Sequence, residues 1–168
     1  SARADFTPYP QRAIRTHDFL YIINFHPDRW PMGDPYRLDG DNPPTAAELT
    51  AVTRVTVPDE DAGPTKAWLV GVRDDPQWKS HFEWVYGRRP REELYDLKAD
   101  PHQTRNLAGD TRYARTRAEL ERRLMDELKR TGDPRVVGDG RFFETPPMAG
   151  PTDDVGPAQS PASNLPSP

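Results

Sequence analysis

The sequence predicts an α+β fold that contains a β-hairpin, one further strand and one long amphipathic helix. Residues 9–25 alternate apolar and polar side chains at the period of a strand. Residues 93–97 alternate in the same way and precede Asp100-Pro101, where proline has no N–H to donate to a sheet. Residues 111–131 repeat apolar side chains at the helical period. Together these three patterns set the fold class.

The first pattern predicts a hairpin whose strands are joined at His17-Asp18, since both residue types tolerate the backbone angles of tight turns. The second strand of this hairpin is apolar on both faces, with Phe19, Tyr21, Ile23 and Phe25 on one face and Leu20 and Ile22 on the other. We therefore expect both faces of that strand to be covered.

The segment between the hairpin and residue 93 predicts an irregular insert and short helices. Prolines and glycines in residues 26–63 leave room for one helix near 45–52, where Thr45 and Glu48 form a capping box. Residues 64–72 and 76–86 each begin with proline in the first helical turn, where its missing N–H costs nothing. Gly87 is expected to close the last of these helices.

The long helix is expected to begin after Asp110 as its N-cap and to end at Gly132. Its predicted buried stripe consists of Tyr113, Leu120, Leu124 and Leu128, with Met125 beside it. Its exposed side predicts three i,i+4 ion pairs, which are Arg122–Asp126, Arg123–Glu127 and Asp126–Arg130. A last extended segment is expected over 135–143.

Composition limits the size of the fold and the kinds of partner. With 34% hydrophobic and 30% charged residues in 168, we expect one small core and not two. The net charge of -4 is made of interspersed charges, so nucleic acid is not an expected partner. No apolar run approaches the ~20 residues that a membrane helix needs, so a membrane is not expected either. The absence of cysteine excludes disulfides, thiolate metal sites and a cysteine nucleophile in this sequence.

Domain boundaries follow from the same composition. Residues 1–144 are expected to form one domain with its irregular insert at about 26–63. The proline-rich residues 145–168 are expected to be disordered, because they lack the apolar surface that would offset their ordering entropy. The N-terminus carries neither an initiator methionine nor a signal peptide, so the sequence is expected to be part of a longer protein.

One stretch resembles a known family. Glu93-Leu-Tyr-Asp-Leu97, followed by Asp100-Pro101 and Asn106-Leu-Ala108, resembles the C-terminal signature of the sulfatases, E-L-Y-D-L followed by D-P-x-x-x-x-N-L-A. The resemblance runs roughly from Tyr9 to Gly140. It is greatest to the N-sulfoglucosamine sulfohydrolase branch and its bacterial relatives.

The resemblance implies the second subdomain of an alkaline-phosphatase-like sulfatase, a small antiparallel sheet with a packed C-terminal helix. It implies that the whole protein hydrolyses a sulfate ester or sulfamate on a glycan, with formylglycine as nucleophile and calcium as cofactor. The sequence has no C/S-x-P-S/A-R motif, so no catalytic residue and no metal ligand is assigned. Formylglycine and calcium are expected in an N-terminal catalytic domain, the implied partner. Relatives in the family are lysosomal, periplasmic or secreted.

Candidate glycan contacts are three arginines and a tryptophan. Arg3, Arg12 and Arg15 could donate charge-assisted hydrogen bonds to a sulfate or carboxylate group. The alternative is that they pair with acidic residues or remain solvated, although Arg12, on a buried sheet face, must have a specific partner. Trp30 lies between charged residues and a proline, where its ring could stack on a sugar.

The other tryptophans, Trp68, Trp78 and Trp84, offer the same stacking chemistry, although the spacing of Trp78 and Phe82 fits a helix core better. The four histidines share no metal-ligand spacing. Within the turn at 100–106, Asn106 or His102 is expected to satisfy backbone groups.

Two alternatives to a sulfatase segment remain. One is a free-standing carbohydrate-binding or interaction module. The other is the corresponding subdomain of a phosphodiesterase or phosphonate hydrolase. A C/S-x-P-S/A-R motif encoded upstream would distinguish a sulfatase from the module, and a threonine nucleophile there would indicate the phosphodiesterase group.

Overall fold

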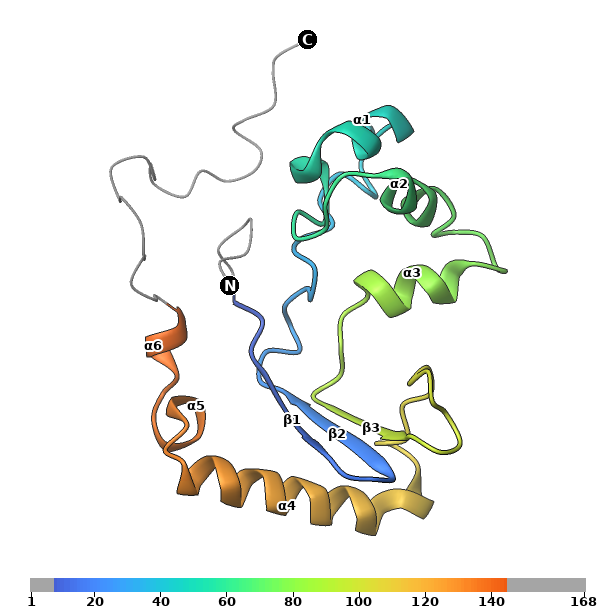
Figure 1. Cartoon of the computed structure of the whole chain (residues 1–168). Coiled ribbons are helices and arrows are strands. Elements are labelled where there is room, and N and C mark those ends of the chain that lie inside the picture. The colour runs from blue at the N-terminus through green and yellow to red at the C-terminus, as the bar shows by residue number, and fades with distance from the viewer. Residues whose placement is uncertain (1–7, 145–168) are drawn as a thin grey trace. The chain divides into compact units, whose positions relative to one another are not determined.

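A computed structural model describes residues 8–144, so the predicted disordered tail at 145–168 lies outside the described residues. The described chain forms two compact units (Figure 1). We call residues 9–28 together with 89–144 the sheet unit, and residues 29–88 the helical unit. Each unit buries its own apolar cluster, so the expectation of a single small core is wrong. The segment expected to be an irregular insert folds around a core of its own.

The sheet unit is built on three antiparallel strands in the order β1-β2-β3 (Figure 1). These strands are β1 Gln11–Arg15, β2 Phe19–Asn24 and β3 Glu92–Asp96. The predicted hairpin and third strand are confirmed, and with them the α+β class. Thr16 stabilises the hairpin turn, because its hydroxyl accepts the backbone N–H of Phe19 at 2.9 Å.

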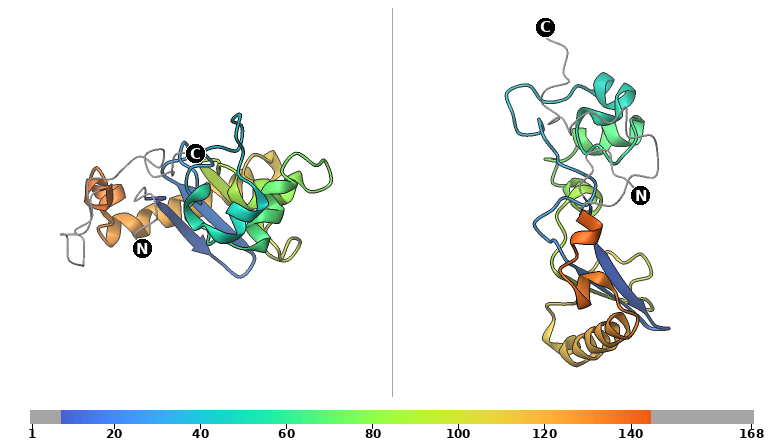
Figure 2. Two further views of the ribbon diagram at one scale, coloured as in Figure 1. Left: turned by 90° about the horizontal axis from the view of Figure 1, so that it is seen from above. Right: turned by 90° about the vertical axis from the view of Figure 1, so that its left-hand side faces the viewer.

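One face of the sheet packs against α4, Ala114–Arg130, which is preceded by the 3-10 turn η2, Thr111–Tyr113 (Figure 2). The predicted helical stripe is confirmed, since the shared core comprises Tyr21, Ile23, Leu94, Leu107, Leu120, Leu124 and Leu128. Asp110 caps the 3-10 turn, where its carboxylate accepts the N–H of Arg112 at 3.0 Å. Hydrogen bonds from the side chain and backbone of Arg112 lower the pKa of Asp110 to about 2.

The exposed ion pairs of α4 differ in part from those expected. Arg122 and Asp126 pair at 3.0 Å, as predicted. Glu127 pairs with Arg130, three residues on, at 2.5 Å. The predicted pairs Arg123–Glu127 and Asp126–Arg130 are therefore wrong, because one short pair in the last turn uses both Glu127 and Arg130. Gly132, with φ of 71°, follows the helix as expected.

The extended segment expected over 135–143 is wrong, because two short helices occupy it. They are α5, Pro134–Val137, and α6, Arg141–Glu144. Asp133 starts α5 by accepting the N–H of Arg135 at 2.9 Å, and Pro134 provides a helical φ at the first position.

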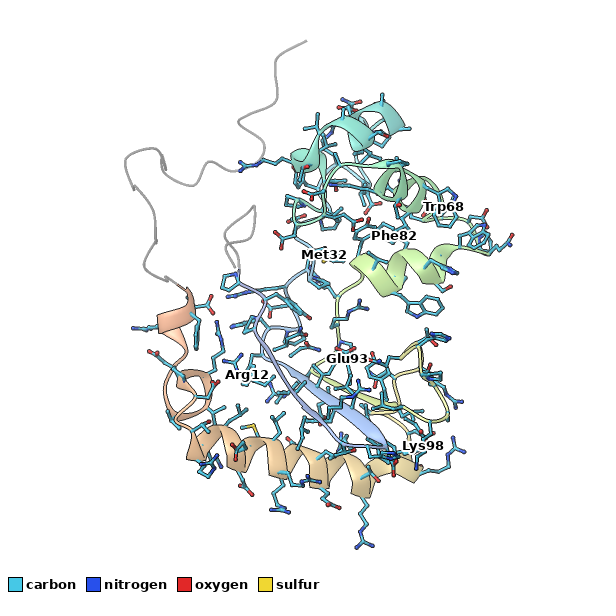
Figure 3. The ribbon with its side chains drawn as sticks, viewed as in Figure 1. Arg12, Met32, Trp68, Phe82, Glu93 and Lys98 are labelled. Carbon is cyan, nitrogen blue, oxygen red and sulfur yellow. The ribbon has the colours of Figure 1, made fainter. Side chains whose placement is uncertain are left out.

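The sheet face away from α4 carries a buried polar network. Glu93, which is 6% exposed, accepts hydrogen bonds from Asn24 Nδ2 at 2.7 Å and from the Tyr95 hydroxyl at 2.5 Å (Figure 3). Leu20 and Ile22 on the same face are half-buried. Burial raises the pKa of Tyr95, and its hydrogen bond to Glu93 raises it further. This face was expected to be apolar, but it carries both apolar side chains and hydrogen-bonded polar side chains.

The helical unit contains α1 Ala46–Ala51, η1 Thr53–Val55, α2 Pro64–Gly71 and α3 Lys79–Tyr86. The helices expected near 45–52 and over 64–72 are confirmed. The helix expected over 76–86 begins only at Lys79, so Pro76 lies outside it, and η1 was not anticipated. Their core comprises Leu38, Leu49, Val55, Val57, Leu69, Val70 and Tyr86, with Phe82 packed against it. Gly87 is the C-cap of α3, and glycine is required there because a Cβ would lie 2.5 Å from the carbonyl oxygen of Glu83.

The capping box at the start of α1 predicts an acid-sensitive helical unit. Glu48 accepts the backbone N–H of Thr45 at 2.8 Å and also pairs with Arg37. These hydrogen bonds lower its pKa to about 2, below the value of about 4.3 in an unfolded chain. The stability that Glu48 provides is therefore present above about pH 4.5 and is lost as pH falls toward 2.

We expect the melting temperature to fall less steeply in Glu48→Gln than in the wild type between pH 6 and pH 3, because glutamine does not titrate. Circular dichroism melts across this range measure the difference. Parallel pH profiles would contradict the assigned role of the Glu48 carboxylate.

Candidate functional site

Arg12 lies on the sheet face that packs against α4 and has a specific partner, as its position predicted. Its Nε donates to Asp133 Oδ2 at 2.7 Å, and its guanidinium carbon lies 5.6 Å from the Phe143 ring centroid (Figure 3). Partial burial opposes ionisation of Asp133, but hydrogen bonds from Arg12 and the Arg135 N–H hold its pKa below the usual value. Arg12 thus ties β1 to the residues after α4.

Arg135 completes a group that we call the C-terminal arginine cluster, made of Arg12, Asp133, Arg135, Phe143 and Glu144. Its Nη1 lies 2.8 Å from Glu144 Oε1, and its guanidinium carbon lies 5.3 Å from the same Phe143 ring. The Arg135 side chain is only 5% exposed. Sequence reasoning missed Arg135, although the helix-start signal of Asp133-Pro134 marks its position.

The structure does not bring the other candidate arginines to Arg12. Arg15 is exposed at the end of β1 and lies three positions after Arg12, so the two side chains leave opposite faces of the strand. Arg3 lies outside the described residues. The described arginines of this set therefore form no common anion site.

Trp30 belongs to the helical unit and is half-buried. The guanidinium carbon of Arg88 lies 4.5 Å from its ring centroid, in a cation–π contact. One face of the Trp30 ring is thus in contact with an arginine that sequence reasoning did not single out.

Lys66 is a buried cation that the sequence pattern did not reveal. It is 1% exposed, and its Nζ donates to the backbone carbonyls of Thr53 at 2.7 Å, Val57 at 3.3 Å and Glu60 at 2.9 Å. Burial lowers its pKa. Val57 has φ of 38°, a strained value for a β-branched residue, so the ammonium group holds together a loop of unfavourable backbone geometry.

Four rings of the helical unit form a continuous group, which we call the aromatic row. It consists of Trp68 on α2 with Trp78, His81 and Trp84 at the start of and along α3. Successive ring centroids lie 5.1, 5.2 and 5.1 Å apart. From the sequence, the three tryptophans were separate candidates, and the position of His81 between them was not anticipated.

Within the signature of residues 93–108, the side chain of Asn106 hydrogen-bonds to backbone groups and so joins β3 to the following turn. Its Oδ1 accepts the N–H groups of Leu94 and Ala108, each at 2.9 Å, and its Nδ2 donates to the carbonyl of Glu92 at 3.1 Å. Asp100 accepts the N–H of Arg105 at 2.8 Å, which lowers its pKa. The expected satisfaction of backbone groups by Asn106 is confirmed.

Residues 8–144 contain no cluster of metal-binding side chains. Between residues 8 and 144, no three or more His, Cys, Asp or Glu side chains are grouped so that they could hold a metal ion. The described residues thus offer no cluster of carboxylates of the kind that holds calcium. Among the helices of the same residues, none is both long enough and apolar enough to cross a membrane.

The α+β fold and the signature held by Asn106 point to the class of the sulfatases, and sequence comparison confirms this resemblance. The chain looks like a C-terminal piece of a sulfatase. It is 31% identical to human N-sulphoglucosamine sulphohydrolase over 136 residues, which make up 81% of this chain and 23% of that protein. It is 28% identical to an ulvan-active sulfatase of Formosa agariphila over 123 residues, 73% of this chain and 17% of that protein.

The chain thus spans less than a quarter of the length of either curated relative. No family model matches the sequence.

Proposed function

We propose that this chain is the C-terminal part of a sulfatase that hydrolyses sulfate ester or sulfamate groups on a glycan. The observation that carries this proposal is the alignment, in which 81% of this chain matches 23% of a sulphohydrolase at 31% identity. The residues of the matched signature hold β3 to the following turn through Asn106, which fits a segment that supplies fold and not reaction chemistry.

The catalytic groups belong, in this proposal, to an N-terminal domain of the same protein. Formylglycine would be the nucleophile there, and calcium would bind the sulfate group. The present segment would be the second subdomain, docked on that domain and forming part of the wall of the glycan site. Arg15 and Trp30 are proposed glycan contacts, Arg15 because it is exposed and Trp30 because of its ring. Arg12 is proposed chiefly to hold β1 in place.

We expect the protein encoded by the complete gene to release sulfate from a sulfated glucosamine substrate, and residues 1–168 alone to release none above a buffer blank. The reason is that this segment lacks the C/S-x-P-S/A-R nucleophile motif. Ion chromatography of released sulfate measures both activities.

The matched control is the complete protein with the nucleophile of its upstream motif replaced by alanine, which should be inactive. Turnover by residues 1–168 alone would contradict the proposal. A gene without the upstream motif would instead support a free-standing module, and a threonine nucleophile would support the phosphodiesterase alternative.

A further inference from the structure

The aromatic row changes from half-buried to exposed along its length. Trp78 and His81 are half-buried, whereas Trp68 is 45% exposed and Trp84 is 43% exposed. Three of the rings lie at intervals of three residues, so they follow one slanted line on α3. The neighbouring Phe82 packs against the core of the helical unit (Figure 3). The core thus holds α3 by Phe82, while Trp68 and Trp84 remain partly exposed.

The contacts within the row fix the orientation of its rings. Trp68 meets Trp78 with an interplanar angle of 70°, and Trp78 meets His81 at 61°. Edge-to-face contacts of this kind leave ring surfaces available on successive members, and each contact restrains the rings it joins. When a ligand stacks on the row, the rings therefore lose little additional conformational freedom.

The surroundings of the row are polar. Gln77, Lys79, Ser80 and Glu83, which adjoin the rings in sequence, are all exposed. A surface that docks a protein partner usually has an apolar centre with few charged residues. Here the partly exposed rings of Trp68 and Trp84 belong to a row that has hydrogen-bonding and charged residues beside it in the sequence. This combination suits a ligand with apolar C–H faces and polar edges, which describes a sugar ring.

We infer that the aromatic row is a glycan-binding platform, on which the pyranose rings of a saccharide chain stack against Trp68 and Trp84. This inference rests on the proposed function, because it supplies a second contact region for the same glycan. Stacking requires the C–H face of the sugar and not its sulfate group. The platform should therefore bind the chain of a substrate independently of the sulfate that is removed.

The test is nuclear magnetic resonance of ¹⁵N-labelled residues 1–168, titrated with a tetrasaccharide that contains N-sulfated glucosamine. The chain has four tryptophans, so each indole N–H can be assigned. We expect saturable shifts of the Trp68, Trp78 and Trp84 signals. The same tetrasaccharide without sulfate groups should bind with affinity within about threefold, since ring stacking is unchanged.

Variants make the test specific. Trp68→Ala combined with Trp84→Ala should weaken binding by about tenfold or more, from the stacking energy of two rings. Val52→Ala is the matched control, because Val52 is 48% exposed in the same unit and lies outside the row. It should leave the affinity unchanged. The phenylalanine versions of both tryptophans should restore part of the affinity.

Several outcomes would contradict the inference that the aromatic row binds glycans. These are no shift with either tetrasaccharide, shifts confined to Trp30, equal affinity in the double alanine variant, or binding that requires sulfate and disappears in high salt. None of them bears on sulfate release by the complete protein, so failure of the platform and failure of the proposed function are distinguishable.

Discussion

Leu124→Asp should unfold the sheet unit, with a loss of about 4 kcal/mol or more in the free energy of unfolding. Leu124 is 5% exposed in the middle of the stripe by which α4 packs against Tyr21, Ile23 and Leu94. Removing a buried leucine costs about 2–5 kcal/mol in itself. A carboxylate at this position adds the cost of burying a charge without a partner. The total approaches the whole stability of a small domain.

Urea denaturation followed by circular dichroism measures the loss. The matched control is Ala118→Asp, which introduces the same side chain at an exposed position of α4 and should cost less than about 1 kcal/mol. Equal transitions for Leu124→Asp and the wild type would show that α4 does not pack on the sheet through this stripe.

Lys66→Met should destabilise the helical unit by about 3 kcal/mol or more. Methionine has nearly the same length as lysine but donates no hydrogen bond, so the carbonyls of Thr53, Val57 and Glu60 would lose their shared donor. The Val57 carbonyl keeps the N–H of Glu60 as a donor. A buried carbonyl that is left without a partner costs about 1–3 kcal/mol. The strained backbone at Val57 would also lose the group that holds it.

Amide hydrogen exchange measures this effect for each unit separately, with the largest change expected around residues 53–60. The control is Lys79→Met, the same substitution at an exposed lysine of the same unit, which should change stability by less than about 0.5 kcal/mol. If the two variants exchange alike, the carbonyls around Lys66 do not depend on its ammonium group.

The sequence by itself determined the elements whose signals are local. The alternation of apolar and polar side chains predicted the hairpin and the third strand, and the spacing of the leucines predicted the buried stripe of α4. The capping box of Thr45 and Glu48 located α1, since both partners lie within one turn. The signature over residues 93–108 indicated the sulfatases. In each case, the predictive signal lies within one short stretch of the chain.

Only the tertiary structure decided how distant residues combine. Arg12 pairs with Asp133, 121 positions away, and no periodicity encodes such a distance. The second core was missed because its apolar residues are spread thinly over residues 38–86, and become a cluster only when three helices meet. A lysine is expected at the surface from the sequence alone, yet the Lys66 ammonium group is buried among three backbone carbonyls. The aromatic row likewise arises where α2 brings Trp68 to the rings of α3, because side-chain packing between helices depends on their relative placement.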